Sequence, residues 1–427
     1  MRLSMYCYVL GASRIPFVRS FTRYQDLSMQ ELMEASLKSL VKKYRLQDQR
    51  IGDVALGAVM KSSRDWNLAR ECVLGSGLHA ATPAYDTQRA CGTSLENALQ
   101  IQLKIQAGRI QSGIAGGVDS NSDLPFLYPR SFGRKLMALR GSKKFLEKLG
   151  LGLNFRWRDF RPEIPAVVEA RTQLSMGQHC ELMVQEWGIS REAQDRLAVQ
   201  SHLNAEKAYQ EGFYEELVME FQGVSKDSFV RGDSDTQKLA KLKPAFERGP
   251  LGTLTAGNSS PLTDGSASVL LGNEVFAKFQ GQEPWARWVD GEVAALDYLR
   301  GEGLLMAPSL AVARLLERQK LKLQEFDFYE IHEAFAGQVL CTLEAWKSPR
   351  YAQAHWNGSP LGEIDMGKLN VVGSSLALGH PFAATGARIT GTLAKLLRLS
   401  KGAKPRRGLI SICTAGGMGV AAILESC

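Results

Sequence analysis

Apolar and polar residues alternate along the first half of the chain with the periods of helices and strands in turn. Residues 26–45 place Leu32, Leu37, Leu40 and Val41 on one helical face, which predicts an amphipathic helix. The other predicted elements of this half are strands at 6–10, 51–60 and 111–118 and helices near 67–78 and 93–107. Because strands and helices alternate, the pattern favours an α/β layered fold.

The second half of the chain repeats this arrangement. A strand and then a helix are predicted in FDFYEIHEAFA, a turn and a helix in GHPFAATGARITGTLAKLLRLSKG, and two strands around a glycine-rich turn in RGLISICTAGGMGVAAILES. The similarity of the halves indicates an internal duplication of one α/β unit. Between them, residues 122–245 are rich in charged and amide side chains and include a long polar helix that Ser190 is placed to cap. We interpret this region as an inserted subdomain.

Length and composition are those of a globular protein. With 427 residues, 44% of them apolar and 22% charged, the chain can form two or three domains around a large core. No uncharged apolar run approaches the roughly 20 residues that span a bilayer, and the N-terminus lacks the features of a signal peptide. We therefore expect a cytoplasmic protein.

The seven cysteines are widely scattered, and none of them belongs to a C-x-x-C pair. This spacing argues against a disulfide framework and against a zinc site, so we expect reduced thiols and no bound metal. One or two of these thiols are then available for catalysis.

The positive charge of the chain is concentrated in one segment. Residues 130–161 hold ten Lys or Arg and two acidic residues, a net charge of +8 that equals the charge of the whole chain. No aromatic stacking platform or nucleic-acid-binding motif accompanies this charge, which argues against a nucleic-acid partner. Phe132, Leu136, Leu139 and Leu146 interleave with the basic residues, a pattern typical of helices that lie on anionic membranes or partners. A solvated face over a small satellite core remains the alternative.

Cys91 is the first candidate for chemistry, in the sequence RACGTS. It lies between a predicted strand and a helix that begins near Thr93. Backbone N–H groups and the positive end of the helix dipole would lower the thiol pKa and favour the nucleophilic thiolate. The same N–H groups could hold an oxyanion. A buried structural cysteine is the alternative interpretation.

His380 and Cys413 are the next candidates, both at glycine-rich turns. His380 lies in ALGHPFAATGAR, where small residues allow a close approach, and it could be the base that activates Cys91 or a side chain that caps a turn. Cys413 ends an apolar strand in SICTAGGMG and could act as an acid and base, or be a strand-end thiol. Backbone N–H groups at 415–417 could form an anion-binding nest.

His332 opens HEAFA after the apolar run FDFYEI, and it could donate a hydrogen bond to a thioester oxygen or cap a helix. The second histidine of the H-E-x-x-H zinc signature is missing. The loop TAGNSSPLTDGSAS at 255–268 holds small and hydroxyl residues that suit a tight approach to a polar ligand.

Together these segments resemble the thiolase family, in order as well as in kind. The matching motifs are RACGTS, MGQHCE, ISREAQD, AKLKPAF, TAGNSSPLTDG, HEAFA, ALGHPFAATGAR and CTAGGMG, from about residue 10 to residue 425. The resemblance implies an α/β thiolase fold of two similar βαβαβαββ halves, layered as an α/β/α/β/α sandwich. It implies an N-terminal domain at 1–275, with the loop subdomain at 122–245 inserted, and a C-terminal domain at 280–427.

The resemblance also implies a role for each matching residue. Cys91 matches the nucleophile that accepts the acyl group, His380 the histidine that activates it, and Cys413 the second cysteine, which shuttles a proton. His332 and His380 match one oxyanion hole, and the backbone N–H groups of Cys91 and Ala415 match the other. The positions that match contacts to coenzyme A are Arg231, Ser260, Ala334 and Phe335.

The resemblance implies an acyltransferase that needs no cofactor, because coenzyme A is its substrate. His332 in HEAFA and the basic insert resemble the thiolase subunits of fatty-acid β-oxidation complexes. This implies a 3-ketoacyl-CoA thiolase, a homodimer that could pair with a hydratase/3-hydroxyacyl-CoA dehydrogenase subunit and contact a membrane through 130–161. Departures from the family pattern lie at Gly92, Ser374, Ser375 and the MAPS segment around Pro308, and they bear on acyl chain length.

Three alternatives are left open by the sequence. An acetoacetyl-CoA thiolase that condenses two acetyl-CoA molecules would use the same residues. A ketoacyl synthase or hydroxymethylglutaryl-CoA synthase shares the nucleophilic cysteine, although Cys413 in CTAGGMG argues for a thiolase. A protein that only binds acyl-CoA or lipid would show no acyl adduct on Cys91.

Overall fold

The structure, a computed structural model, describes residues 5–163, 168–400, 402 and 404–427. Ten strands in this part of the chain form one mixed sheet with the order β4-β3-β5-β6-β1-β7-β10-β9-β8, and β2 pairs with β6 off this path. The strands are β1 Cys7–Arg14, β2 Val18–Arg19, β3 Asp53–Leu56, β4 Ala84–Asp86, β5 Ser112–Asp119, β6 Thr263–Gly272, β7 Ala286–Ala295, β8 Phe328–Ile331, β9 Arg407–Thr414 and β10 Met418–Glu425.

The strand order is nearly symmetric about the junction of β1 with β7. On one side β3 runs parallel to β5 and β5 antiparallel to β6, and on the other β8 runs parallel to β9 and β9 antiparallel to β10. The two halves meet through a short antiparallel pairing of β1 with β7. The predicted arrangement of two similar α/β halves is confirmed.

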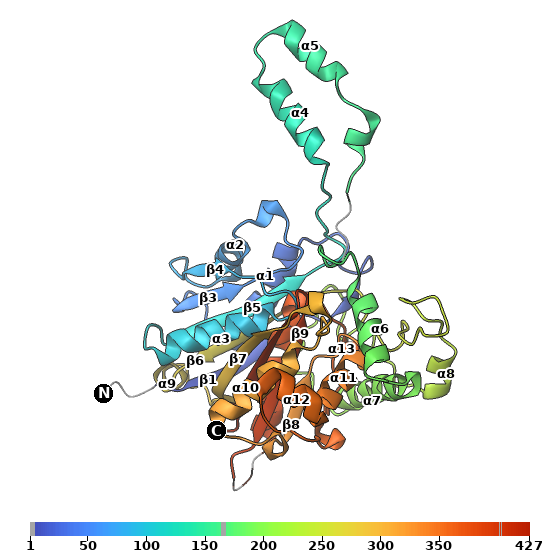
Figure 1. Cartoon of the computed structure of the whole chain (residues 1–427). Helices are drawn as coiled ribbons and strands as arrows, with labels where there is room; N and C mark the ends of the chain where they lie inside the picture. The colour runs from blue at the N-terminus through green and yellow to red at the C-terminus, as the bar shows by residue number, and fades with distance from the viewer. Residues whose placement is uncertain (1–4, 164–167, 401, 403) are drawn as a thin grey trace.

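Helices lie in layers around these strands (Figure 1). The helices of this framework are α1 Met29–Lys43, α2 Leu68–Ser76, α3 Thr93–Gln106, α9 Glu274–Gln280, α10 Ala307–Gln319, α11 Ala336–Lys347, α12 Pro349–Trp356, α13 Ser375–Leu378 and α14 Thr385–Leu399. α1 packs on strands of the first half, α10 on strands of the second, and α14 on strands of both. Because α14 is buried on nearly all sides and packs against α3, these two helices form the central layer.

The insertion lies between β5 and β6, where the second half has only the short turn between β9 and β10. Its helices are α4 Arg130–Gly141, α5 Phe145–Leu153, α6 Met176–Glu186, α7 Arg191–Gln210 and α8 Thr236–Ala240. Ser190 caps α7, as predicted, since its side chain accepts a hydrogen bond from the Ala193 N–H. α7 packs against α11 and α13, so this part of the insertion belongs to the body of the protein.

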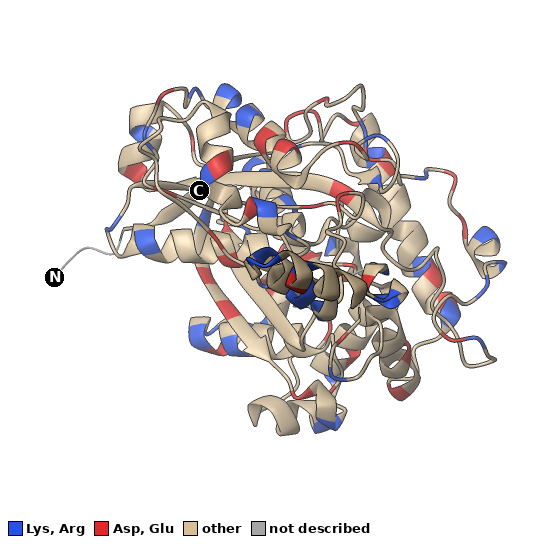
Figure 2. Ribbon diagram, turned by 90° about the horizontal axis from the view of Figure 1, so that it is seen from above, with Lys and Arg blue, Asp and Glu red and all other residues tan. Residues whose placement is uncertain are grey.

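The α4–α5 hairpin projects away from the body (Figure 1). None of the residues in these two helices is buried, and Leu146 is 79% and Leu149 54% exposed. In the view from above, Lys and Arg colour much of this hairpin blue (Figure 2). The leucines of this hairpin are therefore uncovered, whereas Phe132, Phe155 and Phe160 pack against one another at its base, with ring centroids 5.5 to 5.8 Å apart. No helix in the described ranges is long and apolar enough to cross a membrane.

Candidate active site

The turn that carries Cys91 is strained and tightly packed. Ala90 has a left-handed backbone with φ of 43°, a conformation that residues with a side chain rarely adopt and that often marks a functional site. The Thr93 hydroxyl holds this turn, because it donates to the Ala90 carbonyl and accepts from the Arg89 N–H. A Cβ on Gly92 would lie 2.9 Å from a methyl group of Val420, so only glycine fits after Cys91. α3 then begins at Thr93, as predicted.

His380 faces the thiol across the central layer. Its Nε2 lies 3.2 Å from the Sγ of Cys91, and its Nδ1 lies 2.6 Å from the Thr385 hydroxyl. The two residues are neighbours because α3 and α14 meet at their first turns: a Cβ on Gly386 would clash with the backbone nitrogen of Leu95. The structure therefore brings together a nucleophile and a base whose ring is oriented by a third group.

Cys413 and the turn after it close the site from the second half. Cys413 is buried near the end of β9, and its pKa is raised by burial and by the nearby Cys91. The backbone N–H groups of Ala415 and of Cys91 itself lower the pKa of the Cys91 thiol, against the larger effect of burial. Within the predicted nest at 415–417, the Gly416 N–H donates to the carboxylate of Glu169, at 2.6 Å. The insertion thus supports the turn that carries the Ala415 N–H.

His332 lies beside His380 rather than at a helix cap. The two ring centroids are 4.1 Å apart, and α11 begins only at Ala336, with Phe335 as its N-cap. The Nδ1 of His332 lies 2.8 Å from the Ser375 hydroxyl, whereas its Nε2 is buried without a partner among the described residues. The Cys91 sulfur and one ring nitrogen each of His332 and His380 lie within 4.8 Å of one another. Three such atoms so close together could also bind a metal ion. Two imidazoles therefore surround one thiol.

Burial dominates the acid–base properties of the central pair. It raises the pKa of Cys91 to about 12, although the Ala415 and Cys91 N–H groups oppose this shift. Burial and, as the smaller cause, the charge of Arg388 together lower the pKa of His380 to about 3. The prediction of a lowered thiol pKa is wrong for the free enzyme, because desolvation of the thiolate outweighs the helix N-terminus. The resting pair is a neutral thiol beside a neutral imidazole, which can accept the thiol proton during attack.

In His380→Asn enzyme, alkylation of Cys91 by iodoacetamide is expected to accelerate about tenfold per pH unit between pH 6 and 9, because only the thiolate reacts and its fraction grows tenfold per unit below the pKa. The rate can be followed by mass spectrometry of the Cys91 peptide. A rate that does not change with pH in this variant would mean that the thiolate is already formed at pH 6 and would contradict the neutral resting thiol.

Three of the four predicted coenzyme A contacts lie together. The Ser260 N–H donates to the Ala334 carbonyl at 3.0 Å, and Ser259 forms a β-bridge with Phe335, so the 255–260 loop lies against the segment after His332. Arg231 is exposed and lies near His202 of α7. Among the described residues, no hydrogen bond or ion pair joins Arg231 to the other three.

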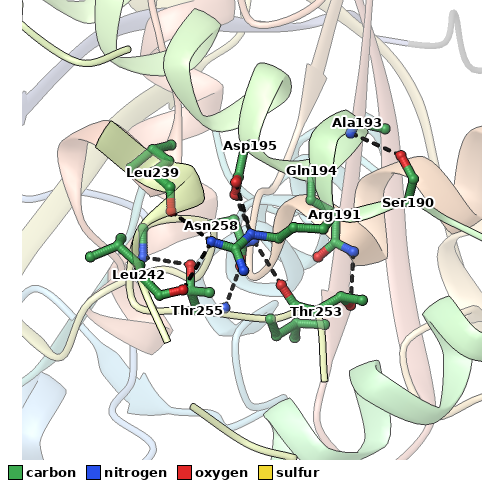
Figure 3. Close-up of polar contacts among 12 residues, drawn as sticks. Ser190, Arg191, Ala193, Gln194, Asp195, Leu239, Leu242, Thr253, Thr255 and Asn258 are labelled. Carbon is green, nitrogen blue, oxygen red and sulfur yellow. Dashed lines mark hydrogen bonds and ion pairs between the residues drawn. The ribbon is translucent and has the colours of Figure 1, made fainter. Parts of the chain in front are cut away.

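The 255–260 loop is anchored on the first turns of α7 (Figure 3). The Asn258 amide donates to the carboxylate of Asp195, at 2.9 Å, and that carboxylate also pairs with Arg191. Arg191 in turn donates to the carbonyls of Leu239 and Leu242. The Asn258 carbonyl accepts from the Ala336 N–H, which ties the loop to the start of α11.

The sequence interpretation missed several residues that support the site. Thr385 orients His380, and Asp119 accepts hydrogen bonds from the backbone N–H groups of Met60 and Ala383 beside the site. The sequence offers a signal for each of these two residues. Asp119 is a polar side chain at the end of a buried strand, and Thr385 is a hydroxyl residue shortly after a candidate base. Glu169 offers no such signal, because it comes from the distant insertion.

Two comparisons of sequence agree with this geometry. Residues 7–275 match the N-terminal domain of thiolase and residues 283–426 match its C-terminal domain. A 3-ketoacyl-CoA thiolase of Photorhabdus laumondii is 38% identical over 425 residues, covering 98% of this chain and 96% of that protein. A 3-ketoacyl-CoA thiolase of Serratia proteamaculans is 39% identical over 425 residues with the same coverage, 98% and 96%.

Solved structures give the same result. Human mitochondrial 3-ketoacyl-CoA thiolase in complex with CoA superimposes with a TM-score of 0.82 at 26% identity, covering 100% of this chain and 99% of that chain. An acetyl-CoA acetyltransferase of Bacillus anthracis superimposes with a TM-score of 0.81 at 29% identity, covering 100% of both chains. The chain matches both thiolase domains, and it matches named relatives along almost their whole length. The chain therefore belongs to the thiolase family of acyltransferases.

Proposed function

We propose that the protein is a 3-ketoacyl-CoA thiolase, which uses coenzyme A to cleave a 3-ketoacyl-CoA into acetyl-CoA and a shortened acyl-CoA. The observation that carries this proposal is the 3.2 Å approach of His380 Nε2 to Cys91 Sγ, beside a second buried thiol. Support also comes from relatives named 3-ketoacyl-CoA thiolase that are 38% and 39% identical to the chain.

The first half-reaction forms an acyl enzyme. The Cys91 thiol passes its proton to His380 Nε2 while the sulfur attacks the 3-keto carbon. The backbone N–H groups of Cys91 and Ala415 hold the oxygen that becomes negative, where one such donor typically contributes about 3–4 kcal/mol. The bond between C2 and C3 then breaks, and its electron pair leaves as the enolate of acetyl-CoA, whose oxygen His332 and His380 stabilise. Cys413 gives the enolate carbon its proton.

The second half-reaction transfers the acyl group to coenzyme A. The proton that His380 took from Cys91 first returns to the Cys413 thiolate. The coenzyme A thiol then passes its proton to His380 Nε2 while its sulfur attacks the carbonyl carbon of acyl-Cys91, and the departing Cys91 sulfur takes that proton as the Cys91 thiol forms. Two half-reactions with a covalent intermediate predict ping-pong kinetics. We propose contacts to coenzyme A from Arg231, Ser260, Ala334 and Phe335, with no metal and no redox cofactor in the cycle.

The two half-reactions separate the roles of the two thiols. Cys413→Ala is expected to reduce the cleavage of 3-ketoacyl-CoA about 10³-fold and to abolish deuterium exchange at C2 of acetyl-CoA, because no group remains to move that proton. Exchange of labelled coenzyme A into acyl-CoA needs only Cys91 and His380, and it should persist. Equal loss of both exchange reactions would contradict a proton-shuttling role for Cys413.

An acetoacetyl-CoA thiolase is the second candidate, since the chain superimposes on an acetyl-CoA acetyltransferase with a TM-score of 0.81. Coenzyme A-dependent thiolysis should be measured across 3-ketoacyl-CoA substrates of increasing length. Activity with long chains supports the first proposal, whereas activity confined to acetoacetyl-CoA supports the second. No thiolysis at any length would refute both.

The partners form part of the proposal. We infer a cytoplasmic homodimer, with an associated hydratase/3-hydroxyacyl-CoA dehydrogenase subunit as the partner that would supply 3-ketoacyl-CoA. The α4–α5 hairpin, with its net charge of +8 over 130–161 and its uncovered apolar residues, suits contact with an anionic membrane.

Deletion of the hairpin is expected to abolish flotation with anionic vesicles while thiolysis persists. The deletion is practicable because the two ends of the hairpin lie side by side. At its base, Leu127 and Glu163 exchange backbone hydrogen bonds. Wild-type protein should float with anionic vesicles in a salt-dependent manner and not with neutral ones. Unchanged flotation of the deletion variant would exclude the membrane contact.

A further inference from the structure

A buried arginine lies behind His332, at the two serines that depart from the family pattern. Arg388, on the first turns of α14, is only 3% exposed. Its guanidinium donates to the hydroxyls of Ser374 at 3.1 Å and Ser375 at 2.6 Å. The Ser375 hydroxyl also lies 2.8 Å from the Nδ1 of His332. A chain of hydrogen bonds therefore runs from Arg388 through Ser375 to His332.

The direction of this chain follows from what each group can donate. A guanidinium has five N–H donors and no acceptor, so the Ser375 oxygen must accept from Arg388. A hydroxyl has one hydrogen, and among the described residues the other hydrogen-bonding partner of the Ser375 hydroxyl is the Nδ1 of His332. If that hydrogen goes to Nδ1, Nδ1 is an acceptor, and the proton of a neutral imidazole must sit on Nε2.

We infer that Arg388 and Ser375 are positioning residues that hold His332 in the tautomer with its proton on Nε2, so that a neutral ring donates a hydrogen bond to the thioester oxygen of the substrate. This inference rests on the proposed function, and it assigns to Ser375 and Arg388 a part in the same site. Without that orientation, the ring could equally present a lone pair to the enolate oxygen and repel it.

The surroundings of His332 fit such a donor. Nε2 is buried and has no partner among the described residues, and an unpaired buried N–H is costly unless a ligand completes it. The ring lies against that of His380, with centroids 4.1 Å apart, and therefore beside the reacting thiol. A substrate oxygen placed beside the Cys91 thiol, at the edges of the two rings, would pair with Nε2.

Charge keeps the ring neutral while it donates. Burial lowers the pKa of His332 well below its usual value, and the neighbouring His380 and Arg388 lower it further. Burial lowers the pKa of Arg388, and the nearby buried carboxyl groups of Glu330 and Glu333 oppose that shift. The arginine thus polarises Ser375 without turning His332 into an imidazolium.

The tautomer can be read from ring ¹⁵N spectra of the histidine-labelled full-length enzyme. The chain has six histidines, and His332→Gln identifies the relevant signals by their loss. The expected wild-type spectrum has a protonated Nε2 and a bare Nδ1 at His332. Ser375→Asp offers an acceptor to both Arg388 and Nδ1, so it should move the proton to Nδ1. A wild-type proton on Nδ1 would overturn the inference.

Kinetics test the consequence of this tautomer. Ser375→Ala should lower kcat for thiolysis about tenfold and leave KM for coenzyme A little changed. This loss of rate is smaller than the loss that follows removal of a whole oxyanion-hole donor, because His332 itself remains. Ser375→Thr, which restores the hydroxyl, should recover most of kcat. Thr390→Val is the control, because it removes from α14, the helix that carries Arg388, a buried hydroxyl that has no partner among the described residues.

The outcomes separate the two proposals. If the wild-type enzyme cleaves no 3-ketoacyl-CoA, the proposed function fails, whereas the spectrum still reports the tautomer. If thiolysis is present but Ser375→Ala matches wild type in kcat, the positioning role fails while the proposed function stands.

Discussion

Cys91→Ala enzyme is expected to lose coenzyme A-dependent thiolysis by at least about 10⁴-fold, because no other group in the site can form the covalent acyl intermediate. Cys413 cannot replace it, because the second thiol is buried, its pKa is raised, and no ring nitrogen of the described residues lies within hydrogen-bonding distance of its sulfur. Initial rates with a saturating 3-ketoacyl-CoA, measured by the loss of its enolate absorbance, give the comparison.

The control for this variant is Cys427→Ala, which removes the exposed last thiol of the chain and should leave the rate unchanged. A normal circular dichroism spectrum would show that Cys91→Ala is folded. Thiolysis by the folded variant at more than about one-hundredth of the wild-type rate would remove Cys91 from its proposed role.

His380→Asn is expected to lose about 10³-fold in kcat/KM. Asparagine keeps a polar group near Thr385 but cannot take the Cys91 proton, and a general base typically contributes about 10²–10⁴-fold. The loss should depend on pH in a defined direction. Without the base, the thiolate must come from solvent, so the residual rate should rise about tenfold per pH unit below the Cys91 pKa of about 12.

Wild-type kcat/KM should be much flatter over the same range, pH 6 to 9, because the pKa of His380 is lowered to about 3 and the ring is a free base throughout. The comparison requires full pH profiles of both enzymes with one substrate. Parallel profiles, offset by a constant factor, would mean that His380 does not act as the base for Cys91.

Local patterns predicted those parts of the site that depend on neighbours in the sequence. The start of α3 at Thr93 follows from a glycine and a hydroxyl after Cys91, and the cap at Ser190 follows from the polar helix behind it. Periodicity also predicted the two similar halves. The contact of Gly386 with Leu95 joins the two halves and brings His380 to Cys91. Because it links segments almost 300 residues apart, no local pattern predicted it, and the family resemblance was the guide.

Other features escaped prediction because they depend on burial and on the path of the insertion. A helix N-terminus suggested a lowered pKa for Cys91, but the depth of the thiol in the folded protein decides the sign. The pairing of Glu169 with Gly416 and of Ser375 with Arg388 and His332 has no periodic signal, since each joins separate elements. The basic segment was visible in the sequence, whereas its projection as a hairpin was not.

The most direct test of the account is the mass of the Cys91 peptide after the enzyme reacts with a 3-ketoacyl-CoA in the absence of free coenzyme A and is quenched in acid. The expected peptide carries the shortened acyl group on Cys91, and addition of coenzyme A before the quench removes it. An acyl group on a different cysteine, or thiolysis without any adduct on Cys91, would contradict the mechanism.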